Sequence, residues 1–161
     1  MSRLTCEPAW VQPLEDEEAV AELAARFSAF AKPPVVIYLR GDLGAGKTTF
    51  ARAYVHSLGF HGYVKSPSYG LLETYEAGGQ KILHLDLYRI EDPEELEYLA
   101  LRDLFDDESV LLVEWPDRGG RQLPGPDLAL EFGENHEDRF VACFVHTERG
   151  RSLAKMAAIG T

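Results

Sequence analysis

A glycine-rich segment that ends in a lysine and a hydroxyl residue has the residue types of a phosphate-binding site. It reads G-D-L-G-A-G-K-T over residues 41–48 and fits the pattern G-x-x-x-x-G-K-[ST]. Glycines let successive backbone N–H groups converge on phosphate oxygens, at a helix N-terminus that already favours anions. In this pattern Lys47 reaches the β- and γ-phosphates, and the Thr48 hydroxyl ligates Mg²⁺. The segment therefore predicts nucleotide binding rather than a glycine-rich turn with an incidental lysine.

A carboxylate at the end of a second strand is the next requirement of such a site, because it holds Mg²⁺ or polarises water. Glu114 follows the apolar run 110–113 and supplies that acid. A strand that simply reaches the surface would have the same sequence, so this alternative stays open. Trp115 comes directly after the acid and either forms a wall of the site or packs at the edge of the sheet.

Asp86 belongs to a third group of candidates, in which His84, Asp86 and Tyr88 alternate along one face of a predicted strand. This face either lines the nucleotide site or forms the solvent-facing side of an edge hairpin. His84 has no second histidine at ligand spacing, which argues against a zinc site. Residues 65–69, K-S-P-S-Y, are equally compatible with a loop that senses the γ-phosphate and with a turn built around proline.

Hydrophobic periodicity predicts the elements that would position these residues. We expect the following elements: a helix from Leu14 to Lys32, a buried strand at 35–39, a helix after the glycine-rich loop to Leu58, hairpin strands at 71–77 and 81–89, a capped helix from Asp92 to about Phe105, a buried strand at 110–113, an antiparallel pair at 128–132 and 139–145, and a short helix from Ser152. This order predicts an α/β, P-loop NTPase-like fold with a mixed central sheet flanked by helices.

Length and composition limit the class of protein. The 161 residues suit one domain, with residues 1–13 as a tail and residues 122–161 as a C-terminal strand pair and short helix. A net charge of −11 argues against nucleic-acid binding by the chain alone. Cys6 and Cys143 are the only cysteines, which excludes a disulfide scaffold and favours a cytoplasmic protein. No apolar run approaches the length of a membrane span, and we expect no signal peptide.

Five segments in this order resemble the TsaE (YjeE) family, the small bacterial ATPases of tRNA threonylcarbamoyladenosine biosynthesis. The segments are residues 41–49, 64–69, 84–89, 92–97 and 113–116. The resemblance implies that the chain binds ATP with Mg²⁺ and hydrolyses it weakly alone. It also implies association with the TsaD–TsaB pair, which places the threonylcarbamoyl group on N6 of adenosine 37 of tRNA. Contact with tRNA would then be made only through the complex.

The resemblance also implies a role for each matching residue. The nucleotide-binding positions would be Gly41, Asp42, Leu43, Gly44, Ala45, Gly46, Lys47, Thr48, Thr49 and Trp115. Thr48 and Glu114 would hold the metal, with Glu114 and Asp86 as the catalytic carboxylates. Whether Asp86 holds metal or positions water stays open. Ser68 stands where the family usually has threonine, a loss of one methyl group.

The position of the adenine cannot be assigned from these motifs. The segment near Glu15 and the C-terminal hairpin are the candidates. Three other functions are compatible with a phosphate loop. A small-molecule kinase needs an acceptor pocket and usually an arginine-bearing lid, a GTPase needs an N-K-x-D stretch that this chain lacks, and a binding module would need ATP without turnover.

Overall fold

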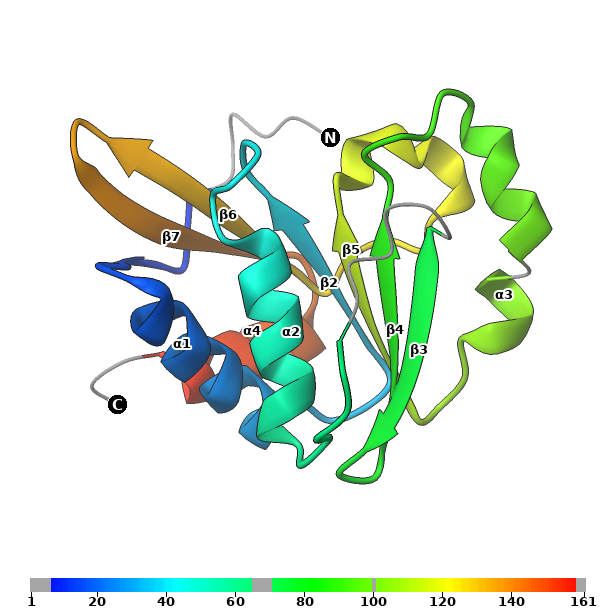
Figure 1. Ribbon diagram of the computed structural model, residues 1–161, viewed down its shortest axis with the longest axis horizontal. Helices are drawn as coiled ribbons and strands as arrows, with labels where there is room; N and C mark the ends of the chain where they lie inside the picture. Colours follow the sequence, from blue (N-terminus) through cyan, green and yellow to red (C-terminus); the bar gives the residue numbers. More distant parts are fainter. Residues whose placement is uncertain (1–6, 65–70, 100, 159–161) are drawn as a thin grey trace.

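The structure is a computed structural model, which describes residues 7–64, 71–99 and 101–158. Its elements in chain order are β1 (Trp10–Pro13), α1 (Glu17–Phe30), β2 (Val35–Arg40), α2 (Lys47–Ser57), β3 (Leu72–Ala77), β4 (Gln80–Asp86), η2 (Pro93–Leu99), α3 (Leu101–Leu104), β5 (Ser109–Glu114), η3 (Pro116–Arg118), η4 (Gly120–Gln122), β6 (Leu128–Asn135), β7 (Asp138–Val145) and α4 (Glu148–Ala157), where η denotes a 3₁₀ helix. The predicted α/β fold with a mixed sheet and flanking helices is confirmed (Figure 1).

The strands form one sheet in the order β1-β7-β6-β2-β5-β4-β3. Strand β2 lies parallel to both of its neighbours, β5 and β6, and β4 is parallel to β5. The remaining pairs, β3–β4, β6–β7 and β1–β7, are antiparallel. The apolar runs of β2 and β5 occupy the middle of the sheet and are buried on both faces, as continuous hydrophobic strands should be.

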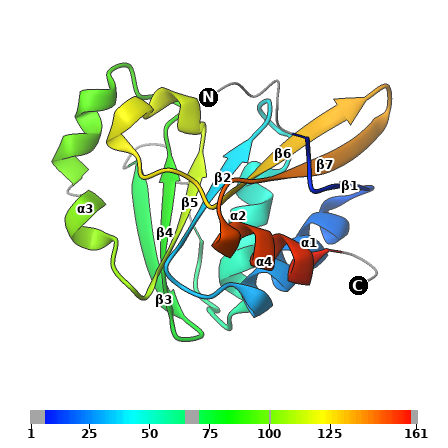
Figure 2. The same cartoon turned by 180° about the vertical axis from the view of Figure 1, so that it is seen from behind.

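Two hydrophobic clusters pack against the two faces of the sheet. Because successive side chains of a strand point to opposite faces, Ile37 of β2 belongs to one cluster and Tyr38 to the other. The larger cluster includes buried residues of α1, α2 and α4. The smaller one includes Leu96 of η2 and Leu101 of α3. Helices α1 and α2 cover one side of the sheet in Figure 1, and Figure 2 shows the molecule from behind.

The first helix begins later than its hydrophobic pattern suggests. Asp16 is its N-cap, and the side chain accepts a hydrogen bond from the Ala19 N–H at 2.9 Å. Leu14, the predicted start, is instead a buried residue between β1 and the cap. The four apolar residues that predicted the inward face of this helix are all buried: Val20, Leu23, Ala24 and Phe27.

Three other boundaries differ from the prediction. Part of the expected N-terminal tail, Trp10–Pro13, is the edge strand β1, because it pairs with β7 through contacts distant in sequence. Strand β4 ends at Asp86 and not at the predicted Arg89. The chain turns directly after it, and the Ile90 N–H donates to the carbonyl oxygen of Leu87. The last helix starts at Glu148 rather than Ser152, capped by Thr147.

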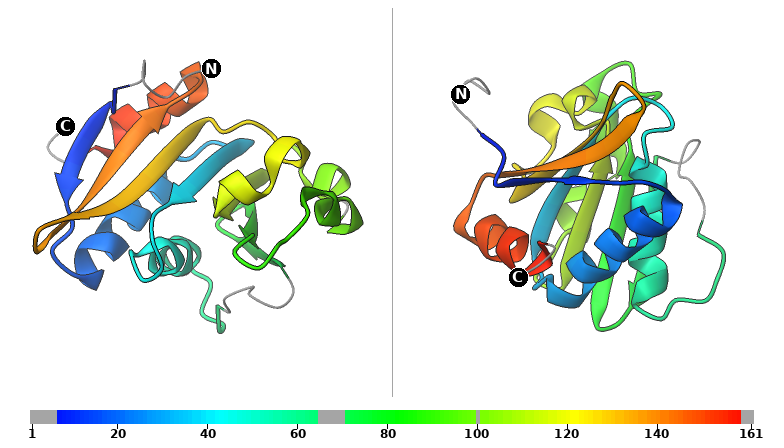
Figure 3. Two further views of the ribbon diagram at one scale, coloured as in Figure 1. Left: turned by 90° about the horizontal axis from the view of Figure 1, so that it is seen from above. Right: turned by 90° about the vertical axis from the view of Figure 1, so that its left-hand side faces the viewer.

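The helix predicted from Asp92 is mostly a 3₁₀ helix, followed by the short α3. Its predicted cap is confirmed: Asp92 accepts from the Glu94 N–H, and the Glu95 carboxylate accepts from the Asp92 N–H, both at 3.0 Å. This region and the β6–β7 hairpin lie at opposite ends of the molecule (Figure 3). In the part of the chain that the structure describes, no helix has the length and apolar character to cross a membrane.

Candidate functional site

The predicted phosphate loop, residues 41–48, connects the C-terminal end of β2 to the N-terminus of α2. Gly41 has φ of +141°, and a Cβ there would lie 2.6 Å from the backbone oxygen of Phe132 on β6. The loop thus passes too close to its neighbour for a side chain at this position. Gly46 precedes α2, and no described side chain caps this helix. The first N–H groups of α2 are therefore available to an anion.

Lys47 is the first residue of α2 and is 4% exposed. Its Nζ donates to the carbonyl oxygens of Gly41 and Asp42, the latter at 2.8 Å. The ammonium also lies 4.4 Å from the centre of the Trp115 ring, a cation–π geometry. Burial lowers the pKa of Lys47 from its ordinary value, and the carboxylates of Glu114 and Asp86 act in the opposite direction.

Thr48 and Glu114 are joined directly. The Thr48 hydroxyl donates to both carboxylate oxygens of Glu114, at 2.9 Å to Oε1 and 3.1 Å to Oε2. Glu114 is the last residue of β5, and it is 2% exposed. This burial argues against the alternative left open by the sequence, in which the strand simply reaches the surface at Glu114. Because β5 is the parallel neighbour of β2, Glu114 and the phosphate loop lie side by side at the C-terminal ends of these two strands.

Asp86 lies beside Glu114 because the two residues are register partners on the parallel strands β4 and β5. Asp86 is 8% exposed and His84 only 1%, so their face of β4 is not the solvent-facing side of a hairpin. Burial raises the pKa of Asp86, and the charge of Glu114 raises it further. The Tyr88 N–H donates to Asp86 Oδ1 at 3.1 Å and opposes this shift.

Trp115 has an unusual backbone for a bulky residue, with φ of +57°. Its ring packs 5.1 Å from that of Tyr88, and the Arg118 guanidinium lies 5.5 Å from the Trp115 ring. Half-buried, Trp115 is one of the residues that line the hollow above the loop. The two sequence alternatives for Trp115 are therefore compatible, since the ring packs against Tyr88 and also borders the hollow.

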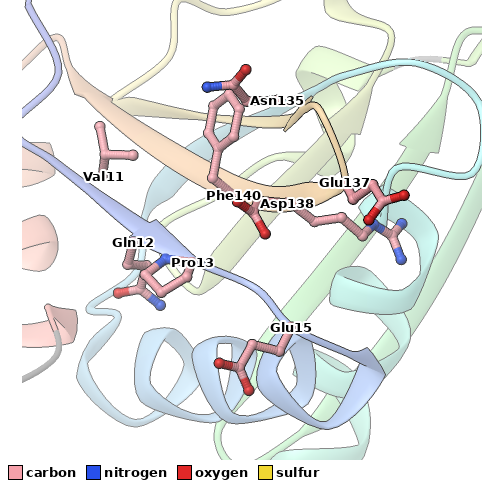
Figure 4. A pocket seen from close by; sticks show the side chains of 9 residues that line it. Val11, Gln12, Pro13, Glu15, Asn135, Glu137, Asp138 and Phe140 are labelled. Atoms are coloured by element: carbon pink, nitrogen blue, oxygen red, sulfur yellow. The ribbon is translucent and has the colours of Figure 1, made fainter.

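Three hollows follow one another along this side of the molecule. The first, of about 440 Å³, contains Lys47, Thr48, Asp86 and Glu114. A smaller one of about 80 Å³ shares the loop glycines with it and extends to Arg139. The third, of about 750 Å³, shares Arg139 with the second and lies between β1 and the β6–β7 hairpin. Figure 4 shows its mixed lining, which includes apolar residues such as Phe140 and acidic side chains from the segment before α1 (Glu15) and from the hairpin (Glu137, Asp138).

Two contacts of the site were not predicted from the sequence. Arg139 Nη2 donates to the carbonyl oxygen of Gly44 at 2.7 Å, which ties β7 to the phosphate loop. His84 Nε2 lies 2.7 Å from Glu114 Oε2. The proposed γ-phosphate sensor, residues 65–69 with Ser66 and Ser68, lies outside the described residues. Among those that are described, no group of three or more His, Cys, Asp or Glu residues could hold a metal.

Comparison with known proteins gives a consistent result. The family model described as "Threonylcarbamoyl adenosine biosynthesis protein TsaE" matches residues 14–141. A relative from Haemophilus influenzae, named "tRNA threonylcarbamoyladenosine biosynthesis protein TsaE", is 36% identical over 147 residues, covering 88% of this chain and 93% of the relative. A Bacillus subtilis relative of the same name is 44% identical over 116 residues, covering 72% of this chain and 70% of the relative.

A solved structure shows the same fold. The crystal structure of YdiB from Bacillus subtilis matches with a TM-score of 0.77 and 28% sequence identity. The match covers 92% of this chain and 93% of the solved chain.

Proposed function

The chain belongs to the TsaE family, and on this premise we propose that it is a magnesium-dependent ATP-binding and ATP-hydrolysing subunit in the biosynthesis of threonylcarbamoyladenosine in tRNA. One observation carries the proposal. Lys47 and Thr48, which begin α2, lie against the strand-end carboxylate of Glu114 in one hollow. A phosphate-binding cation, a hydroxyl and a carboxylate are the groups that nucleotide hydrolysis requires at this position.

The donor set fits Mg²⁺. This ion prefers oxygen ligands and usually takes only one or two carboxylates from the protein, with water and phosphate oxygens completing its shell. The Thr48 hydroxyl and the Glu114 carboxylate supply two such ligands within hydrogen-bond distance of each other. Thr48 and Glu114 would hold the ion, which would neutralise the negative charge that develops on the phosphates.

The protein groups would divide the remaining work. The N–H groups at the start of α2 and the Lys47 ammonium would hold the phosphates, and Lys47 would exchange its contacts with Gly41 and Asp42 for phosphate oxygens. We do not expect Asp86 to contact the phosphates, because its negative charge would repel them. Its place beside Glu114 suits a carboxylate that orients the attacking water or a metal-bound water.

We propose that the nucleoside lies on the side of the phosphate hollow marked by the small hollow, which at about 80 Å³ would take only part of it. The small hollow adjoins the phosphate hollow through Gly44, Gly46 and Thr49, on the side away from Glu114. Its other walls come from the segment around Asp16 and from Arg139. Both sequence candidates for the adenine position, the segment near Glu15 and the C-terminal hairpin, therefore meet at this one place.

The partners remain those implied by the resemblance: the TsaD–TsaB pair, with tRNA reached only through that complex. The names of the Haemophilus influenzae and Bacillus subtilis relatives place those proteins in the same pathway. The net charge of −11 supports protein rather than tRNA as the direct target, because a tRNA backbone would repel such a surface.

Phosphate release from ATP tests this proposal, measured in excess Mg²⁺ and in EDTA with the wild type and Glu114→Gln. We expect slow release that requires Mg²⁺ and is lost in the variant. ATP binding without any release would instead support a binding module. Formation of ADP only after an acceptor molecule is added would support a kinase.

A further inference from the structure

His84 is a buried ionisable side chain whose contact with Glu114 the proposed function leaves unexplained. It is 1% exposed, and its Nε2 lies 2.7 Å from Oε2 of Glu114. The contact runs diagonally between parallel strands, since the register partner of His84 is Leu112, two residues before Glu114. Its next neighbour on the same face of β4 is Asp86, so His84 lies directly below the pair of carboxylates.

The direction of this hydrogen bond follows from the acceptor. An ionised carboxylate only accepts hydrogen bonds, so Nε2 of His84 carries the proton that it shares with Glu114. The other ring nitrogen, Nδ1, is buried and has no partner among the residues that the structure describes. Among the described residues, the imidazole therefore makes its side-chain hydrogen bond through Nε2, to Glu114.

Packing alone does not account for a histidine here. The residues on either side along the face, Ile82 of β4 and Leu112 of β5, belong to the large hydrophobic cluster. An apolar side chain would fill this position without burying an unpaired ring nitrogen, which costs free energy. What the histidine adds is a fixed orientation of one carboxylate, with Thr48 on its other side.

We propose that His84 is a positioning residue, whose Nε2–H holds the Glu114 carboxylate in the orientation that binds Mg²⁺. This inference rests on the proposed function and deepens it. Glu114 has two oxygens, and Thr48 contacts both while His84 contacts Oε2 alone. With Oε2 held by His84, the Glu114 carboxylate would keep one oxygen, Oε1, free for Mg²⁺ beside the Thr48 hydroxyl. Partners of this kind typically change metal affinity by about 10- to 100-fold.

The test compares His84→Leu with His84→Gln, in which the amide N–H replaces the lost donor. Binding of methylanthraniloyl-ATP is measured in EDTA and over a range of Mg²⁺ concentrations, alongside phosphate release and thermal unfolding. We expect His84→Leu to need about 10- to 100-fold more Mg²⁺ for half-maximal effect, with unchanged binding in EDTA. His84→Gln is expected to recover most of the loss. His56→Gln, at an exposed histidine of α2, is the matched control.

Three outcomes would overturn the inference. A wild-type Mg²⁺ requirement in His84→Leu shows that the carboxylate needs no positioning. Equal loss of EDTA binding and thermal stability in both His84 variants shows a structural role only. If the wild type itself neither binds nor hydrolyses ATP, the proposed function fails and the inference falls with it. In the first two cases the wild type and His56→Gln still bind and hydrolyse ATP, so the proposed function survives.

Discussion

Asp86 and Glu114 are register partners on adjacent parallel strands, and both are buried at the edge of the sheet where the phosphate loop begins. Two carboxylates held side by side repel each other, and this repulsion contributes to the raised pKa of Asp86. Such an arrangement costs stability unless a cation or a proton joins it. We therefore expect that removing a charge from this pair would raise the free energy of unfolding and lower activity.

Replacement of Asp86 by asparagine should separate hydrolysis from binding. Because Asp86 is not a phosphate contact in our account, ATP affinity should be retained. Loss of a group that orients the attacking water should lower phosphate release by about 100-fold or more. Equilibrium nucleotide binding and steady-state phosphate release measure the two effects. Unchanged turnover in Asp86→Asn would show that this carboxylate has no part in the reaction.

The same variant should be more stable than the wild type at neutral pH. Burial, and then Glu114, raises the pKa of Asp86 above its ordinary 3.8. The folded state therefore favours the protonated form of Asp86. Its contribution to the free energy of unfolding is fully present below pH 3.8 and is lost as the pH rises through the folded-state pKa. Urea unfolding should show a positive stability difference for Asp86→Asn at pH 7 that narrows toward pH 4. Asp103→Asn, at an exposed carboxylate, is the control.

Lys47→Ala should weaken ATP binding strongly. A hydrogen bond to a charged group is worth about 1.5–3 kcal/mol, so loss of the ammonium should weaken binding by roughly tenfold or more. Fluorescence titration with an ATP analogue measures this change. Lys155→Ala removes an exposed lysine of α4 and should leave affinity unchanged. Wild-type affinity in Lys47→Ala would contradict the placement of the phosphates.

The local part of this site could be predicted from the sequence, because the loop, Lys47 and Thr48 are consecutive residues with a recognisable spacing. The end of one buried strand could also be assigned, which identified Glu114, whereas the end of β4 was placed three residues too late. The contact between Arg139 and Gly44 could not, since 95 residues separate them and no pattern pairs β7 with the loop. Strand β1 was missed for the same reason: the four-residue sequence W-V-Q-P has no clear periodicity, and only pairing with β7 reveals the strand.

Tyr54→Phe tests the core beneath the site without touching it. The buried Tyr54 hydroxyl donates to Gln80 Oε1 at 2.8 Å, and the Gln80 amide donates to the Ser28 carbonyl at 3.3 Å. Removal of the hydroxyl leaves a buried acceptor without its donor, at a cost of about 1–3 kcal/mol. Urea unfolding should show this loss, with ATP affinity retained. Tyr63→Phe, at an exposed tyrosine, should show neither effect.

Gly150→Ala distinguishes helix propensity from packing. Alanine is the better helix former by about 0.5–1 kcal/mol, so propensity alone predicts a more stable protein. In α4, however, a Cβ at Gly150 would lie 1.8 Å from the backbone oxygen of Asp127. Overpacking of this kind typically costs about 1–3 kcal/mol, so we expect net destabilisation in urea. Ser152→Ala on the exposed side of the helix should be neutral or slightly stabilising.

We propose that the protein hydrolyses ATP at Lys47 and Glu114 and that this activity supports the TsaD–TsaB pair. The most direct test is phosphate release from ATP in Mg²⁺, measured with the protein alone and then with purified TsaD–TsaB pair added. We predict slow release that rises when the pair is present and is absent from Lys47→Ala in both conditions. Release that is indifferent to the pair, or that Lys47→Ala retains, would contradict this account.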